Sequence, residues 1–193
     1  MCGRYQFTSD QNEEIRSIVH QIEQQYGAGA WRPGEIRPTV PAPALTAEGG
    51  TIVPRLYRWG YRLPGTLVIN ARAETAARRP LFRESVASLR CAIPSTGFYE
   101  WDADKHKYLF TLPGENVLFM AGLYAVRDGA PCFCILTTAA NPSIQAVHDR
   151  MPLVLRRDQV TPWLEQADAS DDFLRMVPPP LHSVPADMQM RMW

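Results

Sequence analysis

The sequence contains no long run of apolar residues. Its longest apolar stretches, such as residues 117–126, fall well short of the ~20 residues that a membrane-spanning helix needs. Polar residues soon after Arg4 also leave no apolar core for a secretory signal. We therefore expect a cytoplasmic protein with no membrane partner, associated with the nucleoid when it binds DNA. A composition of 46% hydrophobic and 21% charged residues is typical of a globular chain and excludes disordered and fibrous classes.

Cysteine is scarce, with four residues in the whole chain, at positions 2, 91, 132 and 134. This number is too small for a disulfide scaffold, and the positions lack the paired C-x-x-C spacing of zinc sites. We expect no metal and no cofactor. Cys91, Cys132 and Cys134 lie in apolar strand-like segments and are interpreted as small buried hydrophobes, with a redox pair at 132 and 134 as the alternative.

Lysine is almost absent, because Lys105 and Lys107 are the only lysines among twenty basic residues. The formal net charge of zero excludes a uniformly basic nucleic-acid-binding protein. The segment from Arg55 to Arg90, however, holds eight arginines against two glutamates, a local excess of six positive charges. The planar guanidinium group of arginine presents donors that match the oxygens of phosphate and carboxylate, so this segment favours an anionic partner. The alternative is a solvated surface.

The first half of the chain predicts one longer helix, a hairpin and two short helices. Apolar residues recur at helical spacing over residues 15–26, after Ser9 and Asp10 and before Gly27. Five prolines make residues 31–54 extended, with a turn at residues 48–50, which predicts an edge strand and hairpin. Short helices are expected over residues 72–79 and 81–89.

The second half reads as strands followed by helices. The predicted ranges are 90–93, 98–101, 108–112, 117–126 and 132–138 for strands, a helical turn opening at 141–143, and 158–166 and 170–177 for helices. The last fifteen residues are expected to be extended and peripheral. The short connections favour antiparallel pairing, so we predict an α+β fold: a single compact domain, residues 1–193, with a curved, mainly antiparallel barrel-like β-sheet flanked by short helices.

Cys2 directly follows the initiator methionine, which is commonly removed before small residues. A chain that begins with Cys2 carries an α-amine with a pKa of ~8 beside a thiol with a pKa of ~8.5. An aldehyde can condense with the amine to an imine, and the thiol can then close a five-membered thiazolidine ring. The alternative is an incidental residue in a frayed terminus.

Three further polar residues stand in apolar surroundings. Glu100 lies between aromatic residues, where burial would raise its pKa and make it a general acid or base; a half-exposed position on the polar strand face is the alternative. His148 is a candidate proton shuttle or a structural histidine. Asn70 ends an apolar strand, where its amide can orient a reacting group or cap the next element. Arg150 can bind an anion or pair with Asp149.

Seven short motifs then occur together in one order: Met1-Cys2-Gly3-Arg4-Tyr5, Arg58-Trp59-Gly60, Ile69-Asn70-Ala71-Arg72-Ala73-Glu74-Thr75, Arg90-Cys91-Ala92-Ile93-Pro94, Gly97-Phe98-Tyr99-Glu100-Trp101, Ala121-Gly122-Leu123-Tyr124 and His148-Asp149-Arg150-Met151-Pro152. With these motifs the chain resembles the SOS response-associated peptidase (SRAP) family from residue 2 to about residue 155. The resemblance implies a DNA-repair protein of the SOS response that captures abasic sites in single-stranded DNA through a covalent thiazolidine, which protects the lesion. It also implies a compact fold with a barrel-like antiparallel sheet.

The resemblance further implies roles for individual residues. Cys2 is the nucleophile, Asn70 orients its amine and thiol, Glu100 transfers protons, and His148 assists as a shuttle and binds the opened sugar. Arg72 and Arg150 grip the flanking phosphates, Arg4 helps them, and Trp59 stacks on an adjacent base. After Trp59-Gly60, residues 61–65 lead quickly to Asn70, whereas many members carry a longer segment with a second aromatic. A smaller stacking wedge is therefore expected, and residues 178–193 match no motif.

Two other functions remain as alternatives. The first is a thiol peptidase with Cys2 as nucleophile and His148 as base, whose minimal form is autoproteolytic removal of Met1. The second is a non-covalent single-stranded DNA binder that uses the arginines and Trp59. If the protein released the DNA again in a lyase-like step, the covalent reaction would be a catalytic cycle and the protein an enzyme. The sequence leaves the reversibility of the crosslink open. A monomer is expected, because an N-terminal active site needs no second chain.

Overall fold

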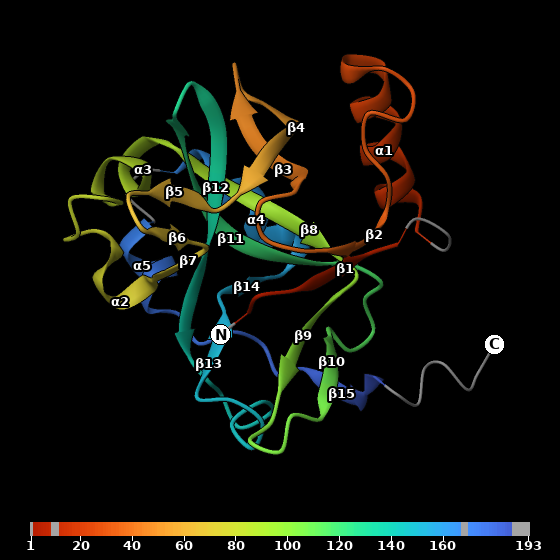
Figure 1. Ribbon diagram of the computed structural model, residues 1–193, viewed down its shortest axis with the longest axis vertical. Coiled ribbons are helices and arrows are strands. Elements are labelled where there is room, and N and C mark those ends of the chain that lie inside the picture. Colours follow the sequence, from red (N-terminus) through yellow and green to blue (C-terminus); the bar gives the residue numbers. More distant parts are fainter. Residues whose placement is uncertain (1, 9–11, 167–169, 187–193) are drawn as a thin grey trace.

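A closed barrel of five strands forms the centre of the structure (Figure 1). The computed structural model describes residues 2–8, 12–166 and 170–186. The barrel strands are β3 (Pro41–Glu48), β4 (Thr51–Trp59), β8 (Arg90–Ser95), β11 (Leu118–Arg127) and β12 (Ala130–Ala139). They pair in the order β12-β4-β3-β8-β11, and β11 pairs again with β12 to close the ring. All these pairs are antiparallel except β12 with β4.

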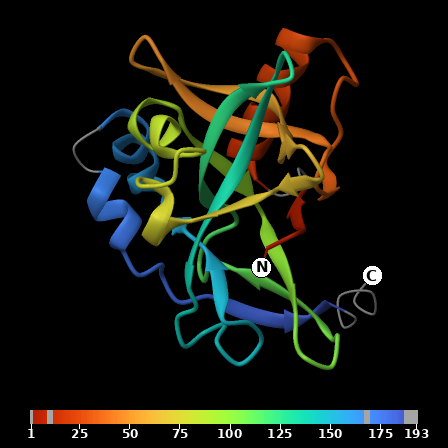
Figure 2. The same ribbon diagram turned by 60° about the vertical axis from the view of Figure 1, so that its left-hand side comes forward.

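A second, five-stranded sheet extends from the barrel (Figures 1 and 2). Its order is β15-β10-β9-β1-β2, with the bounds β1 (Tyr5–Phe7), β2 (Gly34–Ile36), β9 (Gly97–Trp101), β10 (Lys107–Thr111) and β15 (His182–Pro185). Only Thr96 separates β8 of the barrel from β9 of this sheet. The Gln6 carbonyl accepts hydrogen bonds from the Thr96 N–H and the Ser95 hydroxyl, which ties β1 to the bend. The N-terminal strand is thus fixed where the two sheets meet.

Three short strands complete the barrel wall near this junction, and a two-stranded hairpin precedes them. The hairpin consists of β5 (Tyr61–Leu63) and β6 (Thr66–Val68), and the others are β7 (Asn70–Arg72), β13 (Arg150–Pro152) and β14 (Val154–Leu155). Thr137 of β12 pairs with both Arg72 of β7 and Pro152 of β13. Since a strand has two edges, β7 and β13 must lie on opposite edges of β12.

Five helices flank the sheets within the described ranges: α1 (Glu13–Tyr26), α2 (Ala73–Ala76), α3 (Arg83–Ser88), α4 (Arg157–Glu165) and α5 (Ser170–Arg175). The predicted start signals Ser9 and Asp10 lie outside the described residues; the Asn12 side chain caps α1 by accepting from the N–H groups of Glu14 and Ile15. Gly27 ends α1 with φ of 93°, a conformation open mainly to glycine. None of these helices combines the length and the apolar character that a membrane crossing requires.

The predicted fold class is confirmed: the structure is α+β, with a barrel of mainly antiparallel strands and short helices around it. The prediction of an edge strand and hairpin over residues 31–54 is confirmed for β2, which forms an edge of the five-stranded sheet, and for the β3–β4 hairpin, but β3 itself is not an edge strand, because it lies between β4 and β8. Pro41 and Pro43 are tolerated there because β3 registers with β8 only at Leu45, so the proline-containing part of the strand is paired on one side.

The expectation of an extended, peripheral C-terminal end is confirmed for residues 182–185. Strand β15 pairs with β10 and forms one edge of the five-stranded sheet. Residues 187–193 lie outside the described residues.

Candidate active site

Cys2 lies fully buried at the junction of the two sheets. Among the described residues its thiol makes a weak contact with the Arg4 carbonyl oxygen, at 3.8 Å. Burial raises the pKa of the thiol well above its ordinary range, and the nearby Glu100 carboxylate raises it further. The thiol is therefore protonated at neutral pH, and its use as a nucleophile requires a group that accepts the proton. The predicted loss of Met1 lies outside the described residues.

Asn70 connects Cys2 to the barrel. It opens strand β7, which runs parallel to β12 with Asn70 opposite Ile135. Its amide Nδ2 donates a hydrogen bond of 2.9 Å to the Cys2 carbonyl oxygen. Its Oδ1 is buried and has no hydrogen-bond partner within the described part of the chain. The amide thus positions the Cys2 main chain and keeps one acceptor available beside it.

Glu100 lies in β9 and is 3% exposed, so the desolvated position is the correct one of the two predicted for it. Burial raises the pKa of its carboxyl group, and the charge of His148 opposes this rise. A carboxyl group whose pKa moves toward neutrality can both take up and release a proton. Glu100 interacts electrostatically with Cys2 on one side and with His148 on the other.

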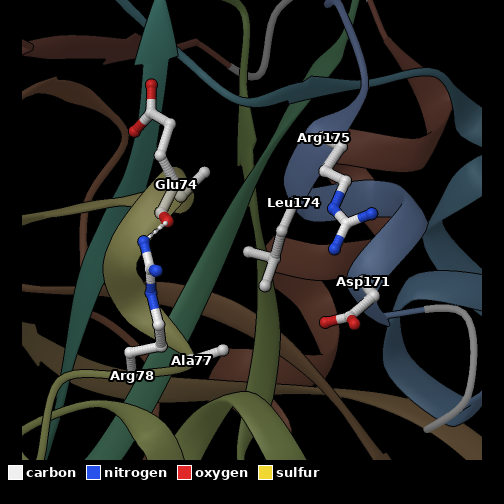
Figure 3. A pocket seen from close by; sticks show the side chains of 7 residues that line it. Glu74, Ala77, Arg78, Asp171, Leu174 and Arg175 are labelled. Atoms are coloured by element: carbon white, nitrogen blue, oxygen red, sulfur yellow. Dashed lines mark hydrogen bonds between the residues drawn. The ribbon is translucent and has the colours of Figure 1, made fainter.

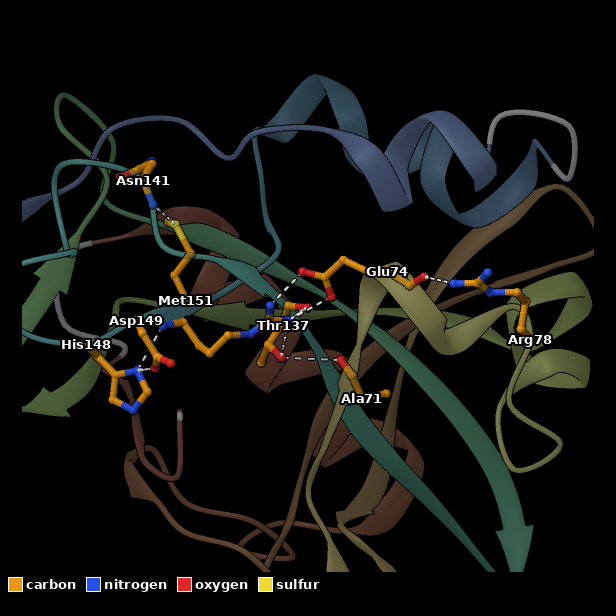
Figure 4. A network of polar contacts seen from close by, with 9 residues as sticks. Ala71, Glu74, Arg78, Thr137, Asn141, His148, Asp149 and Met151 are labelled. Atoms are coloured by element: carbon orange, nitrogen blue, oxygen red, sulfur yellow. Dashed lines mark hydrogen bonds and ion pairs between the residues drawn. The ribbon is translucent and has the colours of Figure 1, made fainter.

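His148 lies near the end of a turn-rich segment, residues 141–149, that joins β12 to β13. Its Nδ1 accepts the Arg150 N–H at 2.9 Å and lies 2.9 Å from the Asp149 carboxylate (Figure 4). The segment is held from the C-terminal side: Asn141 Nδ2 donates to the carbonyls of Pro178 and Pro179, at 2.9 and 3.1 Å. Residues 178 and 179, for which the sequence suggested no role, therefore help to place His148.

Arg150 is engaged in an ion pair rather than exposed. Its guanidinium binds both carboxylate oxygens of Glu74, at 2.6 and 3.0 Å, and the Thr137 carbonyl oxygen at 2.6 Å (Figure 4). The predicted pairing with Asp149 is wrong, since Asp149 lies against His148 instead. The Arg150–Glu74 pair fastens α2 to β12 and β13, and so fixes β7 with Asn70 against the segment with His148.

The other two predicted phosphate-binding arginines lie on different surfaces. Arg72 is exposed at the end of β7. Arg4 lies 3.4 Å from the Glu35 carboxylate and 5.3 Å from the centre of the Trp101 ring. The main chain of Arg4 bonds to Tyr99, so its side chain shares the sheet face of Tyr99 and Trp101, opposite that of Glu100. The structure thus brings Arg72 toward the site through Asn70 and directs Arg4 away from Glu100.

A groove begins at Asn70. It has a volume of about 490 Å³ and is lined by Asn70, Arg72, Arg79, Leu81, Phe82 and neighbouring residues. Two arginines beside apolar side chains match a nucleic-acid strand, which presents phosphates and base faces. A separate cavity of about 420 Å³ lies between α2 and α5 (Figure 3), where Arg78 and Arg175 are balanced by Glu74 and Asp171. Of these two hollows, the groove at Asn70 is the one that adjoins a residue in contact with Cys2.

Trp59 does not fit the base-stacking role that the sequence suggests. Its side chain is 0% exposed, its ring stacks on Phe133 at 6.2 Å, and its indole N–H donates to the Ile69 carbonyl at 3.0 Å. A fully buried ring offers no face to DNA. Trp59 instead packs between β12 and the segment that leads into Asn70.

We expect Trp59→Ala to destabilise the fold by about 3–5 kcal/mol, because the substitution leaves a large cavity and removes the hydrogen bond to the Ile69 carbonyl. Urea unfolding followed by circular dichroism measures this change. A base-stacking role would instead give a variant of unchanged stability that binds DNA more weakly.

The other cysteines and arginines discussed from the sequence divide into buried and exposed residues. All four cysteines are free and buried, which agrees with small hydrophobes at positions 91, 132 and 134. Arg90, counted in the basic segment, is 5% exposed and donates to the carbonyls of Trp163 and Val86, so it has a structural role. Most of the other arginines of that segment are exposed: Arg62, Arg72, Arg78, Arg79 and Arg83. Among the described residues one group has metal-ligand spacing: Asp102, Asp104 and His106, in the β9–β10 turn.

Two residues of the site were missed by sequence reasoning. Glu74 holds Arg150, and Tyr5 lies buried on the sheet face of Glu100. Both occur in the quoted motifs without a role. Strand alternation could have placed Tyr5, because it opens β1 three residues after Cys2. The Glu74–Arg150 pair joins residues 76 positions apart and has no local signal.

A family model described as "SOS response associated peptidase (SRAP)" matches residues 1–191. The chain belongs to the SRAP family. Among its SRAP relatives, the abasic site processing protein YoaM of Bacillus subtilis is 32% identical over 192 residues, covering 91% of this chain and 84% of the relative. The abasic site processing protein YedK of Escherichia coli is 27% identical over 180 residues, covering 86% and 80%.

Solved structures share the SRAP architecture seen here. A protein from Bordetella bronchiseptica superposes with a TM-score of 0.74 at 25% identity, covering 96% of this chain and 99% of the other. A protein from Bacteroides thetaiotaomicron superposes with a TM-score of 0.76 at 21% identity, covering 98% and 94%, and supports the fold alone.

Proposed function

We propose that this SRAP protein processes abasic sites in single-stranded DNA by forming a covalent thiazolidine between Cys2 and the ring-opened sugar. The observation that carries the proposal is the convergence of four residues distant in sequence. Asn70 bonds to Cys2, Cys2 interacts with Glu100, and Glu100 interacts with His148. The names of the SRAP relatives as abasic site processing proteins support the same substrate.

The chemistry requires a free α-amine on Cys2, after removal of Met1. The amine adds to the C1 aldehyde of the opened sugar, and loss of one water gives an imine. The thiol then adds across the C=N bond, so that a C–S bond forms and the thiol proton ends on the ring nitrogen. A thiol with a raised pKa needs a proton carrier for this step, and the Glu100 carboxyl lies within electrostatic range of it.

The DNA strand is proposed to follow the groove from Asn70 past Arg72 and Arg79. Arginine forks bind the phosphates, while Leu81 and Phe82 contact bases or sugars. Arg150 contributes indirectly, because it is committed to Glu74 and positions β7.

The peptidase alternative has weaker support from the geometry. A cysteine peptidase relies on a thiolate stabilised by an adjacent positive charge. Here burial and the Glu100 carboxylate raise the pKa of Cys2, which works against a resting thiolate. The family description as a peptidase therefore fits best with a limited reaction such as removal of Met1.

The first experiment mixes the protein with single-stranded DNA that carries one abasic site and separates the products on a denaturing gel. We expect a shifted band with the native protein, and none with Cys2→Ala or with intact DNA. If mass spectrometry shows Cys2 as the first residue and still no shifted band forms, the covalent mechanism is wrong. Reversible, salt-sensitive binding without preference for abasic DNA would then favour the plain single-strand binder.

A further inference from the structure

A buried hydroxyl group without a partner lies beside the site. Tyr5 is 0% exposed, and its hydroxyl has no hydrogen-bond partner within the described residues. An unpaired buried hydroxyl costs folding free energy, so such groups are uncommon unless they serve a function. The Asn70 Oδ1 atom is unpaired in the same region. The described residues around Cys2 therefore leave one buried donor and one buried acceptor without a hydrogen bond.

The strand register places Tyr5 on the reactive side of the sheet. Tyr5 of β1 pairs with Phe98 of β9, and Glu100 lies two residues further along β9. Residues two apart share a sheet face, so Tyr5, Phe98 and Glu100 point the same way. The Tyr5 ring contacts Trp59 at 5.2 Å, and Trp59 bonds to Ile69, the residue before Asn70. Tyr5 is therefore enclosed between the strands that carry Glu100 and Asn70.

The ionisable neighbours of Tyr5 are thiols. Burial raises the pKa of Tyr5 well above its ordinary range, and the thiolate forms of Cys2 and of Cys91 in β8 raise it further. Glu100 from β9 and His148 from the 141–149 segment complete the ionisable groups around Cys2. A phenol in these surroundings keeps its proton at every pH at which the protein functions, so it acts as an O–H donor.

We propose that Tyr5 is a positioning residue whose hydroxyl donates a hydrogen bond to the Cys2 sulfur as the thiol loses its proton and attacks the imine carbon. The inference rests on the proposed function and deepens it. In this step the S–H bond and the π bond of C=N break, the C–S bond forms, and Glu100 carries the proton to the ring nitrogen. No oxidant or reductant takes part. A hydrogen bond to a charged sulfur is stronger than one between neutral groups, so it assists the thiolate more than the thiol.

The test uses Tyr5→Phe, which removes the hydroxyl and keeps the ring. Tyr61→Phe is the matched control, since Tyr61 is equally buried and its hydroxyl donates to the Leu123 carbonyl at 3.0 Å, away from Cys2. The alkylation rate of Cys2 by iodoacetamide, followed by peptide mass spectrometry between pH 6 and 10, reports the thiolate directly. We expect Tyr5→Phe to slow alkylation about tenfold at neutral pH, which corresponds to a rise of about one unit in the thiol pKa.

The same variants are then mixed with abasic single-stranded DNA. We expect Tyr5→Phe to form the crosslink about tenfold more slowly, while it binds DNA containing a tetrahydrofuran abasic analogue, which has no aldehyde, as tightly as the native protein. Its melting temperature should not fall, because the lost hydroxyl had no partner. Replacement of Tyr5 by 3,5-difluorotyrosine keeps the hydroxyl and makes it a stronger donor, and should shift the alkylation profile to lower pH.

Unchanged alkylation in both Tyr5 variants overturns the proposal. Slower crosslinking with unchanged alkylation also overturns it, because the hydroxyl would then act on the sugar rather than on sulfur. If the native protein forms no crosslink, the proposed function fails, but the alkylation profiles still decide the role of Tyr5.

Discussion

A chain with one additional residue before Cys2 should form no stable covalent complex with abasic DNA. The added peptide bond converts the Cys2 amine to an amide, which cannot form an imine, and the thiazolidine ring needs both nitrogen and sulfur on one residue. A glycine placed between Met1 and Cys2 makes this change. The measurement is the yield of crosslink on a denaturing gel, with intact mass confirming the N-terminal residue. We expect a loss to below detection.

Two controls separate this effect from a loss of DNA binding. The extended chain should still bind tetrahydrofuran-containing single-stranded DNA, because phosphate binding by Arg72 and Arg79 in the groove does not require the Cys2 amine. Cys2→Ser keeps the amine and removes the sulfur, so it should give a complex that survives denaturation only after borohydride reduction of the imine. Equal crosslinking by the extended chain would show that the amine is not the nucleophile.

Glu100→Gln should slow crosslink formation about 100-fold, in the range expected when a positioned proton carrier is lost. Glutamine retains the shape and hydrogen bonding of the side chain but cannot exchange a proton. Release of DNA from a preformed crosslink should slow by a similar factor, since a group that catalyses a step also catalyses its reversal. Glu115→Gln is the matched control, because Glu115 is an exposed glutamate in the turn between β10 and β11. Crosslinking rates measured from pH 5 to pH 9 check the expectation.

The same variant also tests stability. Because burial raises the pKa of Glu100 in the folded state, the folded protein binds more protons than the unfolded chain between the ordinary pKa of glutamate and the raised one. Stability contributed by Glu100 is therefore lost as pH rises through this window. Glu100→Gln should flatten the dependence of unfolding free energy on pH above about pH 4.5. A steeper dependence in the variant would contradict the raised pKa.

The mass of purified Glu100→Gln decides between two origins of a free Cys2. If Met1 remains attached only in this variant, the protein removes its own methionine and the limited peptidase reaction is supported. Normal removal of Met1 assigns that step to a separate aminopeptidase.

Periodicity and turn residues predicted most elements of the fold because these signals are local. The helix over α1, the Glu48-Gly49-Gly50 hairpin and the strands from β8 to β12 all follow from them. Closure of the barrel was not visible in the same way, because it depends on pairing between β12 and β4, whose registered residues lie 74 positions apart, with Cys132 opposite Arg58. The prediction that β3 is an edge strand was wrong for the same reason. A proline shows that one backbone N–H is missing, but it does not show on which side of the strand a neighbour is absent.

The sequence predicted which side chains have suitable chemistry for the candidate site more reliably than it predicted which side chains are accessible. Cys2, Asn70, Glu100 and His148 carry unusual groups in apolar segments, and the structure brings them together. Trp59 and Arg150 carry equally suggestive groups, yet one is packed against Phe133 and the other is paired with Glu74. Sequence shows that an aromatic or a cation is present, whereas its partner is set by tertiary packing.

Segments far apart in the sequence build the surroundings of the site. Strand β1, beside Cys2, is an early element, while β15 and the prolines that bind Asn141 come from the C-terminal part. During synthesis Cys2 therefore leaves the ribosome before β15, the strand that completes the sheet of Glu100. The nascent chain carries Cys2 before the surrounding sheet exists, so control over the reactivity of its aminothiol begins only after β15 has been synthesised.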